Sequence, residues 1–216
     1  MKNLFISFLF VPLAIGIAFN SVSAQSFEGT IAFKKQTPSD TVSYVYYVKG
    51  DKVRLDEIGS KSKKVEGSFI VNLKTSSMVS LSHERKLYIE QVSGTPAAMT
   101  GKADVKKTGN VKTIQGIKCS EYVVKNADEK IQVTYWMASG KFDFFFKLLQ
   151  VLNRKDKSSV YIQQLKGVDG MFPFLSSQIN LETNKEEVKL EVTKLENKII
   201  PANMFEIPKD YTKFQK

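Results

Sequence analysis

The stretch that decides the fold is Lys141–Arg154, which reads KFDFFFKLLQVLNR. As a helix, at 100° per residue, it gathers its polar side chains on one narrow stripe: Asp143, Lys147, Gln150 and Arg154. Phenylalanine, leucine and valine cover most of the remaining circumference. A helix this apolar must be buried on most of its sides, and it is too short to span a bilayer. The sequence therefore predicts a helix that the rest of the chain encloses.

Most of the chain around this helix has the pattern of β-strands. Short segments alternate apolar and polar residues, are rich in β-branched and aromatic side chains, and are separated by polar turns such as Gly50-Asp51. Before the helix, which Ser139 is expected to cap, the predicted strands are Phe27–Lys35, Val42–Lys49, Lys52–Ile58, Ser68–Leu73, Met78–Ser82, Lys86–Val92, Val105–Thr108, Lys112–Gln115, Ile117–Lys125 and Lys130–Ala138. After a polar break at Lys155–Ser159 come the segments Val160–Leu165, Gly167–Pro173, Phe174–Glu182 and Glu187–Leu195.

Strands at this spacing favour one large antiparallel sheet. A closed barrel with an external helix needs only one apolar helix face, whereas this helix has more than one. We therefore predict a mainly β (α+β) fold, a curved antiparallel half-barrel sheet with one or more helices packed in its concave side.

The amino terminus has the parts of a secretory signal peptide. Lys2 precedes an apolar run from Leu4 to Phe19, and small residues lead to a cleavage site after Ala24. An amino-terminal membrane anchor is the alternative interpretation. We expect residues 1–24 to be a signal peptide, residues 25–216 to form a single domain, and the mature protein to be periplasmic, with secretion as a second destination.

The composition is basic. The formal net charge is +10, and loss of Lys2 with the leader leaves +10 − 1 = +9. In an exported protein this balance favours contact with an anionic membrane surface, although lysines that only keep the surface soluble are the simpler interpretation. The lysines are not interleaved with a recognition motif, so we expect no nucleic-acid partner. We expect a monomer.

Catalytic residues are scarce. His83 is the only histidine and Cys119 the only cysteine, so no zinc site of ordinary composition is available. His83 lies in an expected turn, where it is predicted to be solvated, and no nucleophile-elbow sequence accompanies it. Cys119 is predicted to be a small buried hydrophobic residue. The sequence predicts a protein that is not an enzyme and needs no cofactor.

Several short motifs, taken in their order and spacing, resemble a known family. They are Phe27–Ile31, Tyr47–Arg54, Gly109–Tyr122, Tyr135–Ala138 and Pro201–Pro208. The chain resembles an uncharacterised exported bacterial domain family of the superfamily that contains the outer-membrane lipoprotein carrier. The resemblance implies a half-barrel with helices in its concavity, and a concavity that holds acyl chains.

The candidate ligand-binding residues are apolar side chains of the helix, of the segment after it, and of the strand before it. They are Phe142, Phe145, Phe146, Leu149, Leu152, Met171, Phe172, Phe174, Tyr135 and Met137. We predict that they bind a lipid, an acyl chain or a lipidated protein, with the helix and the Gly167–Leu175 segment as gate or lid. The alternative is an envelope interaction or structural module whose concavity is filled by its own side chains.

Overall fold

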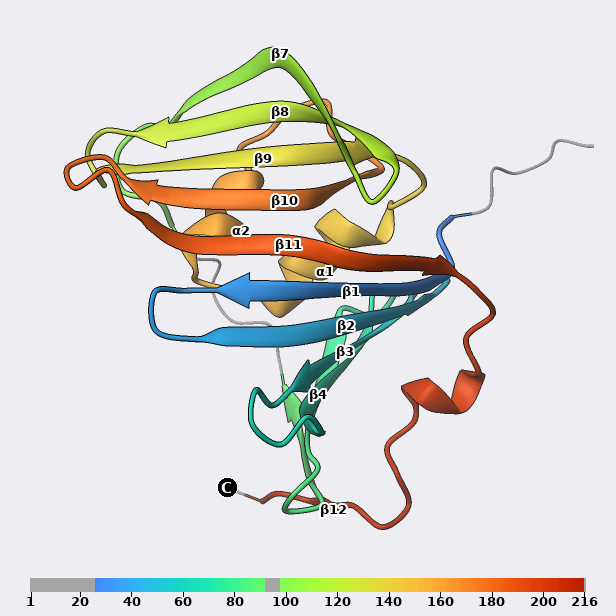
Figure 1. Ribbon diagram of the computed structural model, residues 1–216. Helices are drawn as coiled ribbons and strands as arrows, with labels where there is room; N and C mark the ends of the chain where they lie inside the picture. The colour runs from blue at the N-terminus through green and yellow to red at the C-terminus, as the bar shows by residue number, and fades with distance from the viewer. Residues whose placement is uncertain (1–25, 92–97, 216) are drawn as a thin grey trace, which may run out of the picture.

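A twelve-stranded sheet bends around two helices in the computed structural model of the chain (Figure 1). The structure describes residues 26–91 and 98–215. The strands are β1 Gly29–Gln36, β2 Thr41–Lys49, β3 Lys52–Ile58, β4 Val65–Asn72, β5 Ser77–Ser82, β6 Leu87–Gln91, β7 Asp104–Ile114, β8 Ile117–Asn126, β9 Ile131–Ser139, β10 Met171–Asn180, β11 Glu186–Asn197 and β12 Thr212–Lys213. The helices are α1 Phe144–Leu152, α2 Lys157–Ile162 and the 3₁₀ turn η1 Ala202–Phe205.

The order of strands across the sheet is β12-β6-β5-β4-β3-β2-β1-β11-β10-β9-β8-β7. Most neighbours are antiparallel hairpin partners, and β12 pairs with β6 in parallel. The two halves of the chain meet where β1 pairs with β11, Gly29 opposite Asn197. Figure 1 shows α2 behind β9–β11 and α1 behind β10, β11 and β1, on one side of the sheet, while β3 and β4 turn sharply away below them. The prediction of a curved antiparallel sheet with helices in its concavity is confirmed.

Irregularities in the ladders give the sheet its bends. The register shifts opposite Ala32/Phe33, where the extra residue is Thr193 of β11, at Pro173/Leu175 in β10 and between Lys107 and Val111 in β7. A bulge inserts an unpaired residue, so the strand bends and twists more strongly there. Pro173, which has no N–H to donate to the ladder, lies at one of these bulges.

Some predicted boundaries were wrong. The breaks expected at Gly109-Asn110 and after Pro173 are bulges inside the continuous strands β7 and β10. Ser139 ends β9 and does not cap α1. The chain first crosses to the concave side, where the Phe27 N–H donates to the Lys141 carbonyl at 2.7 Å and the Phe142 N–H donates to the Gly170 carbonyl at 3.2 Å. The helix therefore starts later, with Asp143 at its N-cap position.

Helix α2 is missing from the predicted elements, because its residues were divided between a polar break and an apolar segment. Asp156 caps it by accepting from the Ser159 N–H at 3.1 Å, which is the usual function of an aspartate before a first helical turn.

Residues 1–24, the predicted signal peptide, and Val92, the predicted end of a strand, lie outside the described residues. Cys119 is fully buried, as predicted.

Candidate functional site

Phenylalanine rings fill the middle of the concavity. Phe142 and Phe144 lie next to Phe27, with ring centroids 5.3 and 6.2 Å away. On the other side, Phe145 and Phe172 meet edge to face at 4.7 Å. All five of these side chains are buried. Aromatic pairs at such distances add to the stabilisation from burial alone, so α1 is held by its own rings against β10 and the start of β1.

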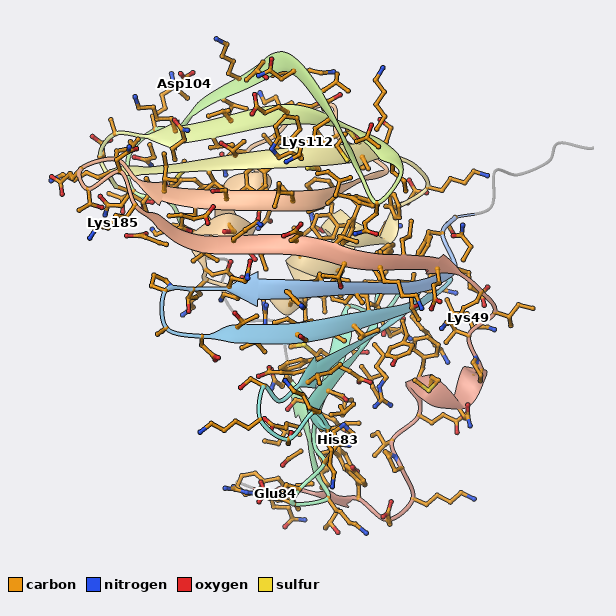
Figure 2. All side chains as sticks on the ribbon, viewed as in Figure 1. Lys49, His83, Glu84, Asp104, Lys112 and Lys185 are labelled. Carbon is orange, nitrogen blue, oxygen red and sulfur yellow. The ribbon has the colours of Figure 1, made fainter. Side chains whose placement is uncertain are left out.

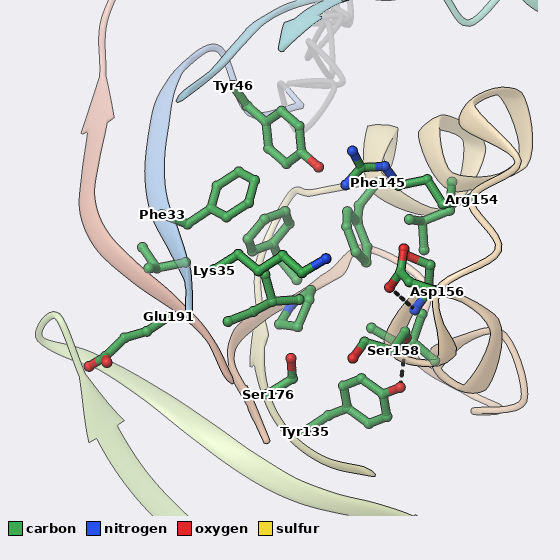
Figure 3. A pocket seen from close by; sticks show the side chains of 17 residues that line it. Phe33, Lys35, Tyr46, Tyr135, Phe145, Arg154, Asp156, Ser158, Ser176 and Glu191 are labelled. Carbon is green, nitrogen blue, oxygen red and sulfur yellow. Dashed lines mark hydrogen bonds between the residues drawn. The ribbon is translucent and has the colours of Figure 1, made fainter. Parts of the chain in front are cut away.

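An apolar cavity remains beside this cluster, between the two helices and the concave face of the sheet. Its volume is about 70 Å³, and with the open mouth included the space between the lining side chains is about 690 Å³. Side chains from β1, β2, β9, β10, β11 and both helices surround it (Figure 3). The lining residues are Phe33, Lys35, Tyr46, Tyr135, Phe145, Leu149, Arg154, Asp156, Ser158, Ser159, Ile162, Phe172, Pro173, Ser176, Leu190, Glu191 and Val192.

Two tyrosines supply polar atoms inside the cavity. The Tyr135 hydroxyl donates to the Ser158 carbonyl at 2.7 Å, and burial raises its pKa well above the ordinary value. Burial also raises the pKa of Tyr46 to about 12, an effect that the nearby Arg154 guanidinium opposes. Both phenols therefore stay neutral at physiological pH and add no negative charge to the cavity.

Charged groups gather at the mouth of the cavity. Figure 3 shows Lys35 from β1 and Arg154 from the α1–α2 connection on opposite sides of the opening, with Asp156 below Arg154. The Asp156 carboxylate accepts from the Ser159 N–H at 3.1 Å and from the Ser159 hydroxyl at 3.0 Å. In the same view Glu191 points away from the cavity. Two cations therefore face the opening, together with the Asp156 carboxylate, which keeps its charge while it caps α2.

Glu129, in the β8–β9 turn, holds α2 in place as the wall of this cavity. It forms an ion pair with Lys157 at 2.8 Å, accepts from the Tyr161 hydroxyl, and accepts from the Thr100 N–H at 2.9 Å. Burial opposes the charge on this carboxylate, but hydrogen bonds from Lys157, Tyr161 and Thr100 prevail and lower its pKa to about 2. The anchor is thus charged at any physiological pH.

The structure brings four of the ten predicted site residues to the cavity wall: Tyr135, Phe145, Leu149 and Phe172. Phe142 and Phe174 belong to the ring cluster, and their centroids are 6.1 Å apart. The other four predicted residues do not line the cavity. Met137 and Met171 are buried elsewhere in the core, and Phe146 and Leu152 are partly buried at its margin.

Most of the segment Gly167–Leu175, which was predicted as part of a gate or lid, belongs to the sheet. Met171 to Leu175 are the first part of β10, where they pair with β9, and Met171 and Phe172 are buried. Sequence reasoning also missed Lys35, Arg154, Asp156 and Ser176 as lining residues, because the cavity brings together β1, the α1–α2 connection and β10, which are separate segments of the chain.

His83 lies near the lower end of the sheet in Figure 2. It is partly buried and hydrogen bonded, so its prediction as solvated surface was wrong. Its Nε2 lies 2.7 Å from the Ser68 hydroxyl and its Nδ1 lies 2.6 Å from the Tyr211 hydroxyl. The Ser68 hydroxyl donates to Asp56 at 2.5 Å, and Arg54 pairs with the same carboxylate at 2.6 Å. A hydrolase triad needs the carboxylate on the second histidine nitrogen, and here Tyr211 is in that place.

Within residues 26–91 and 98–215, no three histidine, cysteine, aspartate or glutamate side chains are grouped so that they could hold a metal ion. In that same part of the chain, no helix has both the length and the apolar character needed to cross a membrane.

Comparison with known proteins gives one family match. The family described as "Domain of unknown function (DUF4412)" matches residues 27–211, which confirms the resemblance to an uncharacterised domain family. No curated protein is significantly similar to the chain.

Several solved structures have a similar backbone. An uncharacterized conserved protein from Thermus thermophilus is 9% identical with a TM-score of 0.49, covering 88% of this chain and 91% of that one. A LolA superfamily protein from Nitrosomonas europaea is 11% identical with a TM-score of 0.36, covering 85% and 91%. A chain of the MucA/MucB complex of Pseudomonas aeruginosa is 12% identical with a TM-score of 0.42, covering 86% and 56%.

Proposed function

The chain belongs to the DUF4412 family, and we propose that it is a non-enzymatic binding protein that takes one apolar chain into the cavity between α1, α2 and the sheet. The observation that carries this proposal is the cavity itself, an apolar space beside the phenylalanine cluster on the concave face that the protein's own side chains leave unfilled. Its phenylalanine, leucine and valine lining favours hydrocarbon, because each methylene that leaves water contributes about 0.8 kcal/mol.

The size of the cavity limits what enters without rearrangement. An apolar cavity of about 150 Å³ binds benzene in another protein, and the enclosed volume here is about 70 Å³. The cavity in this structure therefore accepts the end of a hydrocarbon chain, and the mouth accepts the part of the chain that follows. A longer chain requires Phe145 and Phe172 to move apart, which loosens α1 from β10.

Filling the cavity tests the proposal. Ser176 lies on the cavity floor and points into it (Figure 3), so Ser176→Leu is expected to weaken binding of a fluorescent fatty acid at least about tenfold by occupying the space. Ser177 is its neighbour on the opposite face of β10, and Ser177→Leu is the matched control, expected to bind like the wild type. Native mass spectrometry of the purified wild-type protein should show co-purified lipid. Absence of both lipid and fluorescent response would reject the proposal.

A second candidate function is an envelope interaction or structural module with a self-filled core. The observation that favours it is the phenylalanine cluster, which already occupies the middle of the concavity. The two functions differ in one measurement. A self-filled module gives no response to the fluorescent fatty acid in the wild type, and Ser176→Leu then raises thermal stability without changing any binding.

We also propose that the protein acts in the cell envelope as a monomer. The pattern of residues 1–24 supports export, and the excess of Lys and Arg over Asp and Glu, 32 against 22, supports contact with anionic lipid. A lipid or a lipoprotein is then the proposed partner. Liposome binding that did not depend on salt or on anionic lipid would reject the electrostatic contact.

A further inference from the structure

Within the described residues, two cations at the mouth of the cavity form no ion pair. Arg154 and Lys35 both line it, and within residues 26–91 and 98–215 neither forms an ion pair with a carboxylate within 4.0 Å. Arg154 lies against the Tyr44 and Tyr46 side chains of β2, whose pKa values it influences. Two carboxylates also line the cavity, but neither forms an ion pair with these cations. Asp156 keeps its charge while it accepts hydrogen bonds from Ser159 at the cap of α2, and Glu191 points away (Figure 3).

Apolar walls border these cations directly. Phe33 lies two residues before Lys35 on the same face of β1, and Phe145 and Leu149 of α1 lead from Arg154 into the cavity. A ligand that satisfies both parts has one hydrocarbon chain and an anionic head at its end. A planar carboxylate matches the fork of a guanidinium, and hydrogen bonds with charged partners are stronger than neutral ones.

We propose that this mouth binds the carboxylate of a single-chain fatty acid between Arg154 and Lys35, with its alkyl chain in the cavity. The inference rests on the proposed function and adds the class of ligand. A single chain is chosen because the enclosed space is narrow and bounded by β1, β9, β10, β11 and both helices. Neutral esters and cationic amphiphiles lack the head group that the two cations require.

The test compares acid with ester at constant chain length. Parinaric acid bound to the purified protein is displaced with dodecanoic acid, methyl dodecanoate, dodecyltrimethylammonium or a lysophosphatidate. We expect dodecanoic acid to displace the probe at a concentration at least about tenfold lower than the methyl ester, given the usual strength of hydrogen bonds to charged groups. In Arg154→Gln and Lys35→Gln this preference, taken as the ratio of the two displacing concentrations, should fall severalfold. Parinaric acid itself should bind more weakly to both variants, because it is also a carboxylate.

Matched controls lie next to both residues. Lys34 and Lys155 are exposed neighbours of Lys35 and Arg154 that do not line the cavity, so Lys34→Gln and Lys155→Gln remove the same charge without touching the mouth. They should retain the wild-type preference. Circular dichroism and thermal unfolding confirm that each variant is folded.

Three results would overturn the inference. Equal displacement by acid and ester, unchanged in the two mouth variants, removes the carboxylate site but leaves apolar binding intact. Tighter binding of the lysophosphatidate than of dodecanoic acid assigns the head group to a phosphate. No binding of parinaric acid or of any of the four compounds rejects the proposed function together with this inference.

Discussion

His83 connects the sheet to the C-terminal segment through a chain of hydrogen bonds. One consistent arrangement has the Tyr211 hydroxyl donating to Nδ1, Nε2–H donating to the Ser68 hydroxyl, and that hydroxyl donating to Asp56. This arrangement uses neutral histidine. Burial and, to a smaller extent, the nearby Arg54 guanidinium lower the pKa of His83, while Asp56 opposes them.

The lowered pKa of His83 predicts how stability depends on pH. The unfolded chain takes up a proton near the ordinary pKa of about 6.5, whereas the folded protein resists it until a lower pH. The stabilisation from neutral His83 is therefore complete above about pH 6.5 and is lost as pH falls through the lowered pKa. We expect His83→Gln to cost about 1–2 kcal/mol at pH 8 through lost hydrogen bonds, and less at pH 5.

Urea unfolding of wild type and His83→Gln at a series of pH values from 8 to 5 measures this difference, and other titrating groups cancel between the two proteins. A difference between the two free energies of unfolding that stays constant over the whole range would contradict the lowered pKa.

At the scale of elements, local sequence patterns predicted individual strands and helix α1 well, but they did not predict which distant strands pair. The β2–β3 hairpin was predicted from alternation and the Gly50-Asp51 turn, where Gly50 has a positive φ of 54°. The polar stripe of α1 was also predicted, since Lys147 and Gln150 are exposed. The cavity wall depends on β1 meeting β11, a pairing that no local pattern specifies. Sequence reasoning therefore found the apolar lining from α1 and missed the charged mouth.

Two phenylalanines, Phe145 of α1 and Phe142 just before it, test which rings line the cavity and which only pack in the core. Phe145 faces the cavity and Phe142 does not, although both are buried to the same extent, 5% exposed. Phe145→Ala and Phe142→Ala should each destabilise the protein by about 3–5 kcal/mol, the usual cost of removing a buried ring. Only Phe145→Ala enlarges the cavity, so only this variant should gain affinity for hexadecanoic over octanoic acid.

Urea unfolding measures the cost of each substitution, and displacement of parinaric acid measures the preference for chain length. If the two alanine variants showed the same change in chain-length preference, the ring of Phe145 would not limit the cavity.

At the scale of the whole molecule, the C-terminal segment runs along the sheet from β11 to its far edge (Figure 1). The Ile200 carbonyl accepts from Lys49 at 2.7 Å, and the Met204 carbonyl accepts from Arg54 at 3.2 Å. Ile200 and Phe205, which belong to this segment, are buried. At its end, β12 pairs with β6, which otherwise would present an open edge. The segment thus connects strands that are distant in the sheet order and covers one of its two edges.

Removal of residues 208–216 tests this connection. The deletion eliminates the Tyr211 contact with His83, the Lys86–Asp210 and Lys213–Glu90 ion pairs, and β12. Exposed ion pairs contribute little, so we expect a loss of about 1–3 kcal/mol in the free energy of unfolding, mostly from the hydrogen bonds. The uncovered backbone of β6 should also promote association between copies, visible as light scattering that rises with protein concentration. Deletion of residues 215–216 alone, which leaves β12 in place, should change neither quantity. A monomeric, equally stable protein after the longer deletion would show that the sheet holds its edge without β12.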